Sequence, residues 1–196
     1  MKFIIVGLGN PGKEYENTRH NAGRIALEYF RKKNDFPNWQ ENKKLKALVS
    51  EGKVSRKEVF LVGPETFMNN SGKSVVTLVK SKKAAENLIV IHDDLDLPVG
   101  KMKISFNRGS GGHKGVESIK RAVKTEGFVR IRIGISPKTP SGKTKKPQGE
   151  KLINNFIVAP FKPAELDEIK KTYKKVAEVL LSLIGEGREK AMSQFN

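Results

Sequence analysis

The stretch Lys2–Gly12, with the sequence KFIIVGLGNPG, joins a short apolar run to a glycine-rich turn and decides the class of fold. The run Lys2–Gly7 is typical of a buried β-strand, because it is continuously apolar after Lys2 and ends in glycine. Further strands are predicted over 46–54 and 57–63, as a hairpin, and over 88–91, 101–106 and 129–135, with helical spacing over 20–33, around 75–79 and over 113–124. Strands that alternate with helices predict an α/β fold with helices on both faces of a sheet.

The glycines of this turn formally match the dinucleotide-binding pattern G-x-G-x-x-G over residues 7–12. Such a site needs a helix that begins directly at the glycines and an acidic residue at the end of a second strand. Here polar residues fill 13–20, and Glu28 falls inside a predicted helix, so a nicotinamide site is disfavoured. The turn instead presents Asn10, whose amide can both donate and accept, at the end of a strand. Its alternative role is that of a turn residue.

Composition narrows the class of protein further. The chain has 196 residues, with 38 Lys and Arg against 21 Asp and Glu, so its net charge of +17 favours a polyanionic partner such as nucleic acid. It has no cysteine, which excludes disulfides, thiol catalysis and Cys-ligated metals. No apolar stretch approaches the roughly 20 residues that span a bilayer, and the five apolar residues before Gly7 are too few for the core of a secretion signal, so none is expected. We expect one domain over residues 1–196, in the cytoplasm and away from membranes.

Two segments of the second half differ in character. Ser136–Lys151 is polar and basic with three prolines and two glycines, which predicts a mobile basic loop. After it, apolar residues recur at helical spacing from Pro163 and predict a helix over 163–184. Its apolar stripe is expected to pack in the core.

Histidine and aspartate supply the candidate chemistry. The three histidines, His20, His92 and His113, all lie at the edges of predicted elements, where one of them is expected to act as a base. Asp93 and Asp94 follow a predicted buried strand and can orient such a base. With no cysteine and no G-x-S-x-G motif, water activated by histidine is the simplest chemistry. No zinc-binding spacing is present, so no metal is expected.

The segment Thr66–Gly72 (TFMNNSG) offers a second set of candidates. The amide of Asn69 can orient water or stabilise an oxyanion. Phe67 and Met68 can form an apolar wall for a substrate side chain or a surface on which a base stacks. The alternative is a helix start in which these residues cap the helix and fill the core. We group Met68 and His113 with the expected substrate-binding residues.

Five separated blocks resemble the bacterial peptidyl-tRNA hydrolase family, in the family's order and spacing. They are IVGLGNPGKEYENTRHNAG (5–23), ETFMNNSGKSV (65–75), HDDLDLPVGKMK (92–103), GSGGHKGVESI (109–119) and RIRIG (130–134). The resemblance spans essentially the whole chain. It implies hydrolysis of the ester between a peptide and tRNA, which recycles tRNA for translation. It also implies a single mixed, mostly parallel sheet domain that is monomeric and needs no metal or cofactor.

The resemblance also assigns roles to individual residues. It implies that His20 is the general base, that Asp93 orients it and that Asn10 binds the peptide near the ester. Asn69 would position substrate and water. The other implied contacts are with tRNA: Tyr15 and Phe67 at the acceptor end, and Lys103 and Arg132 near the terminal phosphate. The loop 136–151 and the helix 163–184 would form a lid.

One position departs from the family pattern. Many relatives carry asparagine after the GGH block, where this chain has Lys114, and lysine can donate but cannot accept a hydrogen bond. Lys114 is suited to hold a phosphate instead. Ser105 stands where some relatives have a second lysine, with Arg108 nearby. The alternative function is that of a non-catalytic RNA-binding protein on the same fold.

Overall fold

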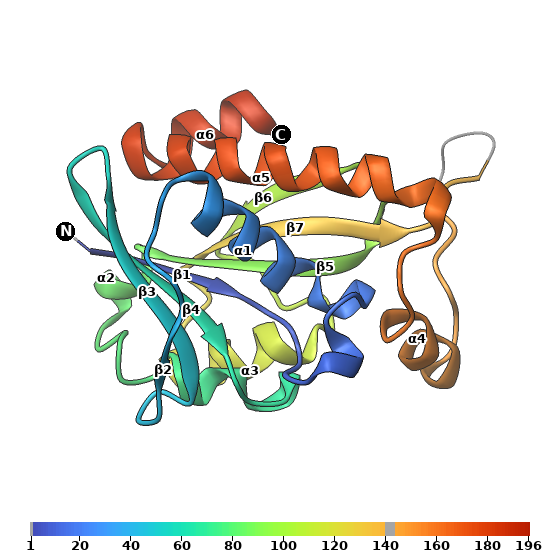
Figure 1. Cartoon of the computed structure of the whole chain (residues 1–196), viewed down its shortest axis with the longest axis horizontal. Helices are drawn as coiled ribbons and strands as arrows, with labels where there is room; N and C mark the ends of the chain where they lie inside the picture. The colour runs from blue at the N-terminus through green and yellow to red at the C-terminus, as the bar shows by residue number, and fades with distance from the viewer. Residues whose placement is uncertain (1, 140–143) are drawn as a thin grey trace.

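A seven-stranded mixed sheet forms the centre of the computed structural model, which describes residues 2–139 and 144–196 (Figure 1). Within these residues the strand order is β2-β3-β4-β1-β5-β7-β6. The strands are β1 (Lys2–Gly7), β2 (Gln40–Asn42), β3 (Ala47–Val54), β4 (Lys57–Pro64), β5 (Leu88–Pro98), β6 (Met102–Phe106) and β7 (Val129–Ser136). The central strands β4, β1, β5 and β7 run parallel, and β2, β3 and β6 pair antiparallel at the two sides. The predicted fold class and the β3–β4 hairpin are confirmed.

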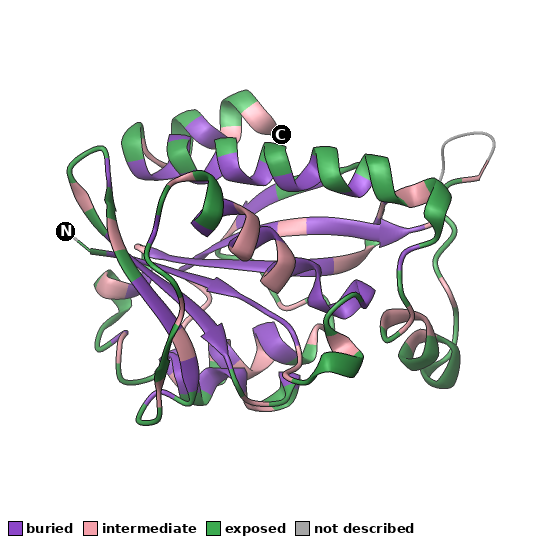
Figure 2. Ribbon diagram, viewed as in Figure 1, coloured by how far each residue is buried: buried purple, intermediate pink, exposed green. Residues whose placement is uncertain are grey.

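Helices cover both faces of the sheet. Along β1, Ile5 packs into the core beneath α1 (Ala22–Lys33) and α5 (Leu166–Gly185), while Ile4 and Val6 pack into a second core with α3 (Lys114–Val123). Figure 2 shows the central strands buried and the outer faces of the helices exposed. The remaining helices are α2 (Lys82–Ala85), α4 (Glu150–Ile157), α6 (Arg188–Phe195) and the 3-10 helices η1 (Lys13–Tyr15), η2 (Arg19–Asn21), η3 (Met68–Ser74) and η4 (Pro163–Glu165). No helix among the described residues is long and apolar enough to cross a membrane.

Two predicted segments, around 75–79 and over 136–151, differ from the structure. The helical spacing around 75–79 belongs to turns that follow η3, and Val75 and Val79 are buried there without a regular helix. Valine is β-branched and the preceding residues are Asn, Ser and Gly, which all disfavour an α-helix. The predicted basic loop 136–151 is shorter, because β7 includes Ser136 and α4 begins at Glu150. Its residues 140–143, and with them that part of the predicted mobile loop, lie outside the described residues.

The predicted core helix is confirmed as α5, and its stripe is buried at Ile169, Tyr173, Val176, Leu180 and Leu183. Because α5 uses this stripe to pack on α1 and the sheet, it forms a fixed part of the core.

Close packing of α1 on β5 depends on Gly23. A methyl group added there would overlap the carbonyl oxygen of Ile91 and lie 2.9 Å from the backbone nitrogen of Leu8. We expect Gly23→Ala to lower the free energy of unfolding by about 2–3 kcal/mol, because the helix must shift away from the sheet. Urea unfolding measures this loss. Gly109→Ala is the control, since nothing lies within 4 Å of a methyl group added at Gly109; an equal loss in both variants would contradict the packing argument.

Candidate active site

Strand β5 carries the carboxylates of the site and is longer than predicted. The sequence suggested a strand over 88–91, but β5 continues through His92, Asp93 and Asp94 to Pro98 and pairs with β7 along this length. The prediction ended too early because the apolar run ends at Ile91, while the strand itself continues to the carboxyl edge of the sheet. Ligands of α/β proteins bind at this edge.

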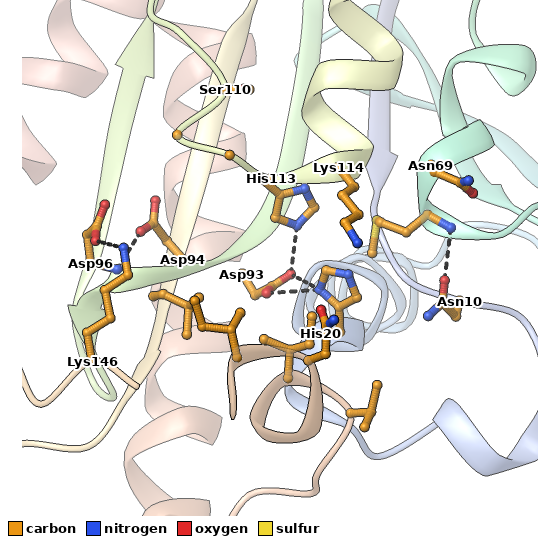
Figure 3. A pocket seen from close by; sticks show the side chains of 18 of the residues that line it. Asn10, His20, Asn69, Asp93, Asp94, Asp96, Ser110, His113, Lys114 and Lys146 are labelled. Carbon is orange, nitrogen blue, oxygen red and sulfur yellow. Dashed lines mark hydrogen bonds and ion pairs between the residues drawn. The ribbon is translucent and has the colours of Figure 1, made fainter. Parts of the chain in front are cut away.

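A cavity of about 490 Å³ opens at this edge (Figure 3). Its lining combines the turn after β1, helix η2, the start of η3, β5, the start of α3 and one side of α4. Seven of the predicted site residues line it: Asn10, His20, Phe67, Met68, Asn69, Asp93 and His113. Tyr15, Lys103 and Arg132 do not line this cavity.

His20 and Asp93 form a buried pair. The Nδ1 atom of His20 lies 3.0 Å from both carboxylate oxygens of Asp93, and the two residues are only 7% and 3% exposed. When Asp93 is ionised, Nδ1–H is the donor, and the tautomer that results leaves Nε2 of His20 available as an acceptor in the cavity. This is the arrangement of a histidine base with an orienting carboxylate.

His113 is a second partner of Asp93. Its Nε2 lies 2.9 Å from Asp93 Oδ1, and its Nδ1 accepts hydrogen bonds from the backbone nitrogens of Gly115 and Val116 at 3.2 and 3.3 Å. Because Nδ1 is an acceptor at the N-terminus of α3, the proton of the neutral ring must be on Nε2, which donates to Asp93. The contact with substrate that was predicted for His113 stays a prediction, and its support of Asp93 was not foreseen.

The pKa values follow from this burial and pairing. Burial lowers the pKa of His20, but the charge and hydrogen bond of Asp93 raise it further than burial lowers it, so the net shift is upward. Burial raises the pKa of Asp93, yet the two imidazoles outweigh burial and hold it well below its usual range. Asp93 is therefore ionised at neutral pH.

His92 is excluded as the base. It is 1% exposed, is absent from the cavity lining and packs its ring 4.7 Å from that of His113. Burial lowers its pKa well below the ordinary value.

Asn10 is held in a defined orientation. Its Oδ1 accepts a hydrogen bond from the backbone nitrogen of Met68 at 2.9 Å. Its own backbone nitrogen donates to Oδ1 of Asn21 at 2.8 Å, and Nδ2 of Asn21 donates back to its carbonyl oxygen at 3.0 Å. These bonds leave Nδ2 of Asn10 available to a ligand. Sequence reasoning missed Asn21, which directly follows His20. Asn69 is exposed at the rim of the cavity.

Helix α4 forms the apolar side of the cavity. Ile153, Ile157 and the following Val158 line it, whereas no residue of α5 does. The predicted lid over 163–184 therefore differs from the structure, in which α4 lies beside the cavity and α5 lies in the core. Sequence reasoning missed α4 because Leu152 and its neighbours follow directly on the basic, proline-rich segment.

Arg19 joins α4 to the His20–Asp93 pair. Its side chain is buried, forms an ion pair with Glu165 at 2.5 Å and donates to the carbonyl oxygen of Ile135 at 2.9 Å. The guanidinium also lies 4.5 and 4.8 Å from the ring centres of Phe156 and Phe161. Since Arg19 precedes His20 directly, it holds His20 and α4 in the same framework.

A second, basic pocket of about 540 Å³ adjoins the site. Its lining includes Lys103, Arg108, Arg130 and Arg132, and it shares Asp94 with the first cavity. Arg132 Nε pairs with Asp94 Oδ2 at 2.6 Å, and Lys103 lies opposite Arg132 in the β6–β7 register. Two of the predicted tRNA-binding residues thus lie together here, whereas Tyr15 lies on η1, half-buried and outside both pockets.

Comparison with known proteins identifies the family to which the chain belongs. The family model described as peptidyl-tRNA hydrolase matches residues 4–196. Similar proteins include the peptidyl-tRNA hydrolases of Thermodesulfovibrio yellowstonii, 37% identical over 99% of this chain and 98% of that protein, and of Aquifex aeolicus, 39% identical over 98% of this chain and 95% of that protein. The crystal structure of peptidyl-tRNA hydrolase from Acinetobacter baumannii aligns with a TM-score of 0.87 at 30% identity, over 99% of this chain and 94% of that one. The chain belongs to the peptidyl-tRNA hydrolase family.

Proposed function

We propose that this protein hydrolyses the ester bond between the peptide and the tRNA of peptidyl-tRNA, with His20 as the general base. The observation that carries the proposal is the buried His20–Asp93 pair in the lining of a cavity, with Nδ1 of His20 bonded to Asp93. Family membership supplies the substrate class. Release of the acylated amino acid from N-acetyl-aminoacyl-tRNA tests the proposal.

The reaction follows from the direction of the hydrogen bonds. Nε2 of His20 takes a proton from water as the water oxygen bonds to the ester carbonyl carbon, and the carbonyl electrons move onto its oxygen. Asp93 stabilises the imidazolium that forms. When the tetrahedral intermediate collapses, the bond to the ribose oxygen breaks, and this oxygen takes the proton back from His20. The products are the free peptide and a tRNA with an intact terminal ribose.

The remaining cavity residues suit the two sides of the scissile bond. Nδ2 of Asn10 is free to donate to a peptide carbonyl, and Asn69 at the rim can orient substrate and water. Phe67 is 59% exposed and presents a face on which a base can stack, while Met68 is buried. Tyr15 is proposed to contact the acceptor end from outside the cavity.

The basic pocket is the proposed site of a tRNA phosphate. We expect the double variant Lys103→Ala, Arg132→Ala to raise KM for N-acetyl-aminoacyl-tRNA about tenfold or more, because each lost phosphate contact weakens binding. The slope of log KM against log salt should also become shallower, since fewer counterions are released. Steady-state kinetics at three or more salt concentrations measures both changes. An unchanged slope would place the tRNA phosphates elsewhere.

We also propose that the enzyme works without a metal. His20, Asp93 and His113 could in principle hold an ion, since one ligand atom of each lies within 4.8 Å of the others. Their hydrogen bonds, however, already satisfy both carboxylate oxygens and the facing ring nitrogens. Incubation with EDTA is therefore expected to leave the rate of hydrolysis unchanged, and strong inhibition that added metal reverses would contradict this.

The proposed function also leads to proposals for the oligomeric state, the location and the partner of the protein. We propose that the protein acts as a monomer in the cytoplasm, where peptidyl-tRNA is produced, and that tRNA is its partner. Its net charge of +17 supports the monomer and the tRNA partner, because positively charged copies repel one another and attract the negatively charged RNA. The alternative of a non-catalytic RNA-binding protein gains no support from relatives that are named as hydrolases.

A further inference from the structure

Lys114 differs from the other charged side chains of the cavity lining. It has no ion-pair or hydrogen-bond partner among the residues that the structure describes. The other charged groups of the lining are paired: Asp93 with His20 and His113, Asp94 with Arg132, and Asp96 with Lys146. Lys114 is also the first residue of α3, where the positive end of the helix dipole disfavours a cation. The helix does not stabilise the positive charge of this exposed side chain, which leaves the ammonium available to a group that enters the cavity.

The ammonium group of Lys114 is directed at the reaction centre. Figure 3 shows its side chain extending from the start of α3 toward His20, on the side of the cavity that also holds Asn69 and Asn10. The electrostatic effect on His20 agrees with this placement. Beyond the effects of burial and of Asp93, the charge of Lys114 lowers the pKa of His20.

We propose that Lys114 is a catalytic residue whose ammonium donates a hydrogen bond to the ester carbonyl oxygen and stabilises the negative charge that develops there. The inference rests on the proposed hydrolysis and adds a residue to it. Water attack moves the carbonyl electrons onto this oxygen, and collapse of the intermediate returns them, so Lys114 keeps its protons throughout. A positioned donor that faces the developing charge stabilises the transition state more than the substrate.

The position of Lys114 favours the ester oxygen over a tRNA phosphate. Cations suited to phosphate gather in the second pocket, where Lys103 and Arg108 lie, and Lys114 does not line that pocket. Lys114 instead shares its cavity with the base, which must lie next to the carbonyl carbon.

The experiment compares Lys114→Met, which keeps chain length but removes the charge, with Lys114→Arg, which keeps the charge. Lys114→Met should lower kcat for N-acetyl-aminoacyl-tRNA about 10²-fold while KM and its salt dependence stay the same. Lys114→Arg should retain clearly more activity. The melting temperature of Lys114→Met should be unchanged or higher, because the charge opposes the helix dipole. Lys124→Met, at the other end of α3, is the control for loss of one exposed lysine and should match the wild type.

The pH profile gives an independent readout. Since Lys114 lowers the pKa of His20, its removal should move the acidic limb of the kcat profile to higher pH. An unchanged kcat in Lys114→Met would overturn the proposal. A higher KM with a shallower salt slope and normal kcat would also overturn it, and would make Lys114 a phosphate ligand. A wild type that does not hydrolyse the substrate would refute the proposed function, and the role of Lys114 with it, so the two failures are distinguishable.

Discussion

Replacement of His20 by alanine is expected to reduce kcat for N-acetyl-aminoacyl-tRNA by about 10²- to 10⁴-fold, the usual contribution of a general base. The reason is that Nε2 of His20, which the bond from Nδ1 to Asp93 leaves free in the cavity, is the proposed proton acceptor. Affinity for tRNA should change little, because the cations proposed to bind phosphate lie in the adjoining pocket. Single-turnover hydrolysis and filter binding of the same substrate measure the two quantities separately.

Two controls make the His20→Ala result specific. The melting temperature of the variant shows whether it is folded, and added imidazole should restore part of the rate by entering the space that the ring vacates. A folded variant with near-normal kcat would rule out His20 as the base. Equal losses of tRNA binding and of hydrolysis would point to a role in binding or folding instead.

Replacement of Asp93 by asparagine should have a comparable effect, with kcat lower by about 10³- to 10⁴-fold. The carboxylate accepts hydrogen bonds from both His20 Nδ1 and His113 Nε2, at 3.0 and 2.9 Å. Asparagine replaces one of the two oxygens by an NH₂ group, and because both oxygens lie 3.0 Å from Nδ1 of His20, this donor would face the Nδ1–H group. His20 would then lose the tautomer that leaves Nε2 free, while substrate binding stays intact. Asp167→Asn, an exposed change of the same kind on α5, is the control and should not alter kcat.

The pH dependence of Asp93→Asn provides a second test. In the wild type, Asp93 raises the pKa of His20 above the ordinary value, so activity should fall as the pH decreases through this raised pKa and protonates the base. Without the carboxylate the pKa of His20 falls, and the acidic limb of the remaining activity should move to lower pH. A limb that stays in place would contradict the proposed pairing.

His20 and Asp93 make the free energy of unfolding depend on pH in opposite directions. Because the pKa of His20 is raised on folding, its contribution is complete below the unfolded value of 6.5 and is lost as the pH rises through the folded value. The pKa of Asp93 is lowered on folding, so its contribution is present above the unfolded value of 3.8 and is lost as the pH falls below it.

The parts of the molecule that sequence reasoning predicted are those with strong local patterns. Continuous apolar runs fixed β1 and the start of β5, and the helical stripe from Ile169 onward fixed α5 as a core helix. His20 and Asp93 are 73 residues apart in the sequence and in hydrogen-bond contact in the structure. Only the resemblance to the family predicted that these two residues form a pair.

The parts that were missed depend on contacts that no local pattern encodes. Arg19 and Asn21 are polar residues near a helix start, and nothing in the neighbouring sequence marks them. Asn21 is bonded to Asn10 in the turn after β1, and Arg19 is paired with Glu165 in η4. The extension of β5 to Pro98 was missed because a strand can carry polar residues where its end borders a cavity. The hydrogen bond from His113 Nε2 to Asp93 could not be predicted, because its direction depends on Nδ1 of His113 accepting bonds at the start of α3.

The most direct test of the central claim is release of labelled N-acetyl-amino acid from N-acetyl-aminoacyl-tRNA, beside the unblocked aminoacyl-tRNA and with His20→Ala as the inactive control. Rapid cleavage of the blocked substrate alone, lost in His20→Ala, is the result that a His20-dependent peptidyl-tRNA hydrolase predicts. A folded wild type that binds tRNA but cleaves neither substrate would contradict it.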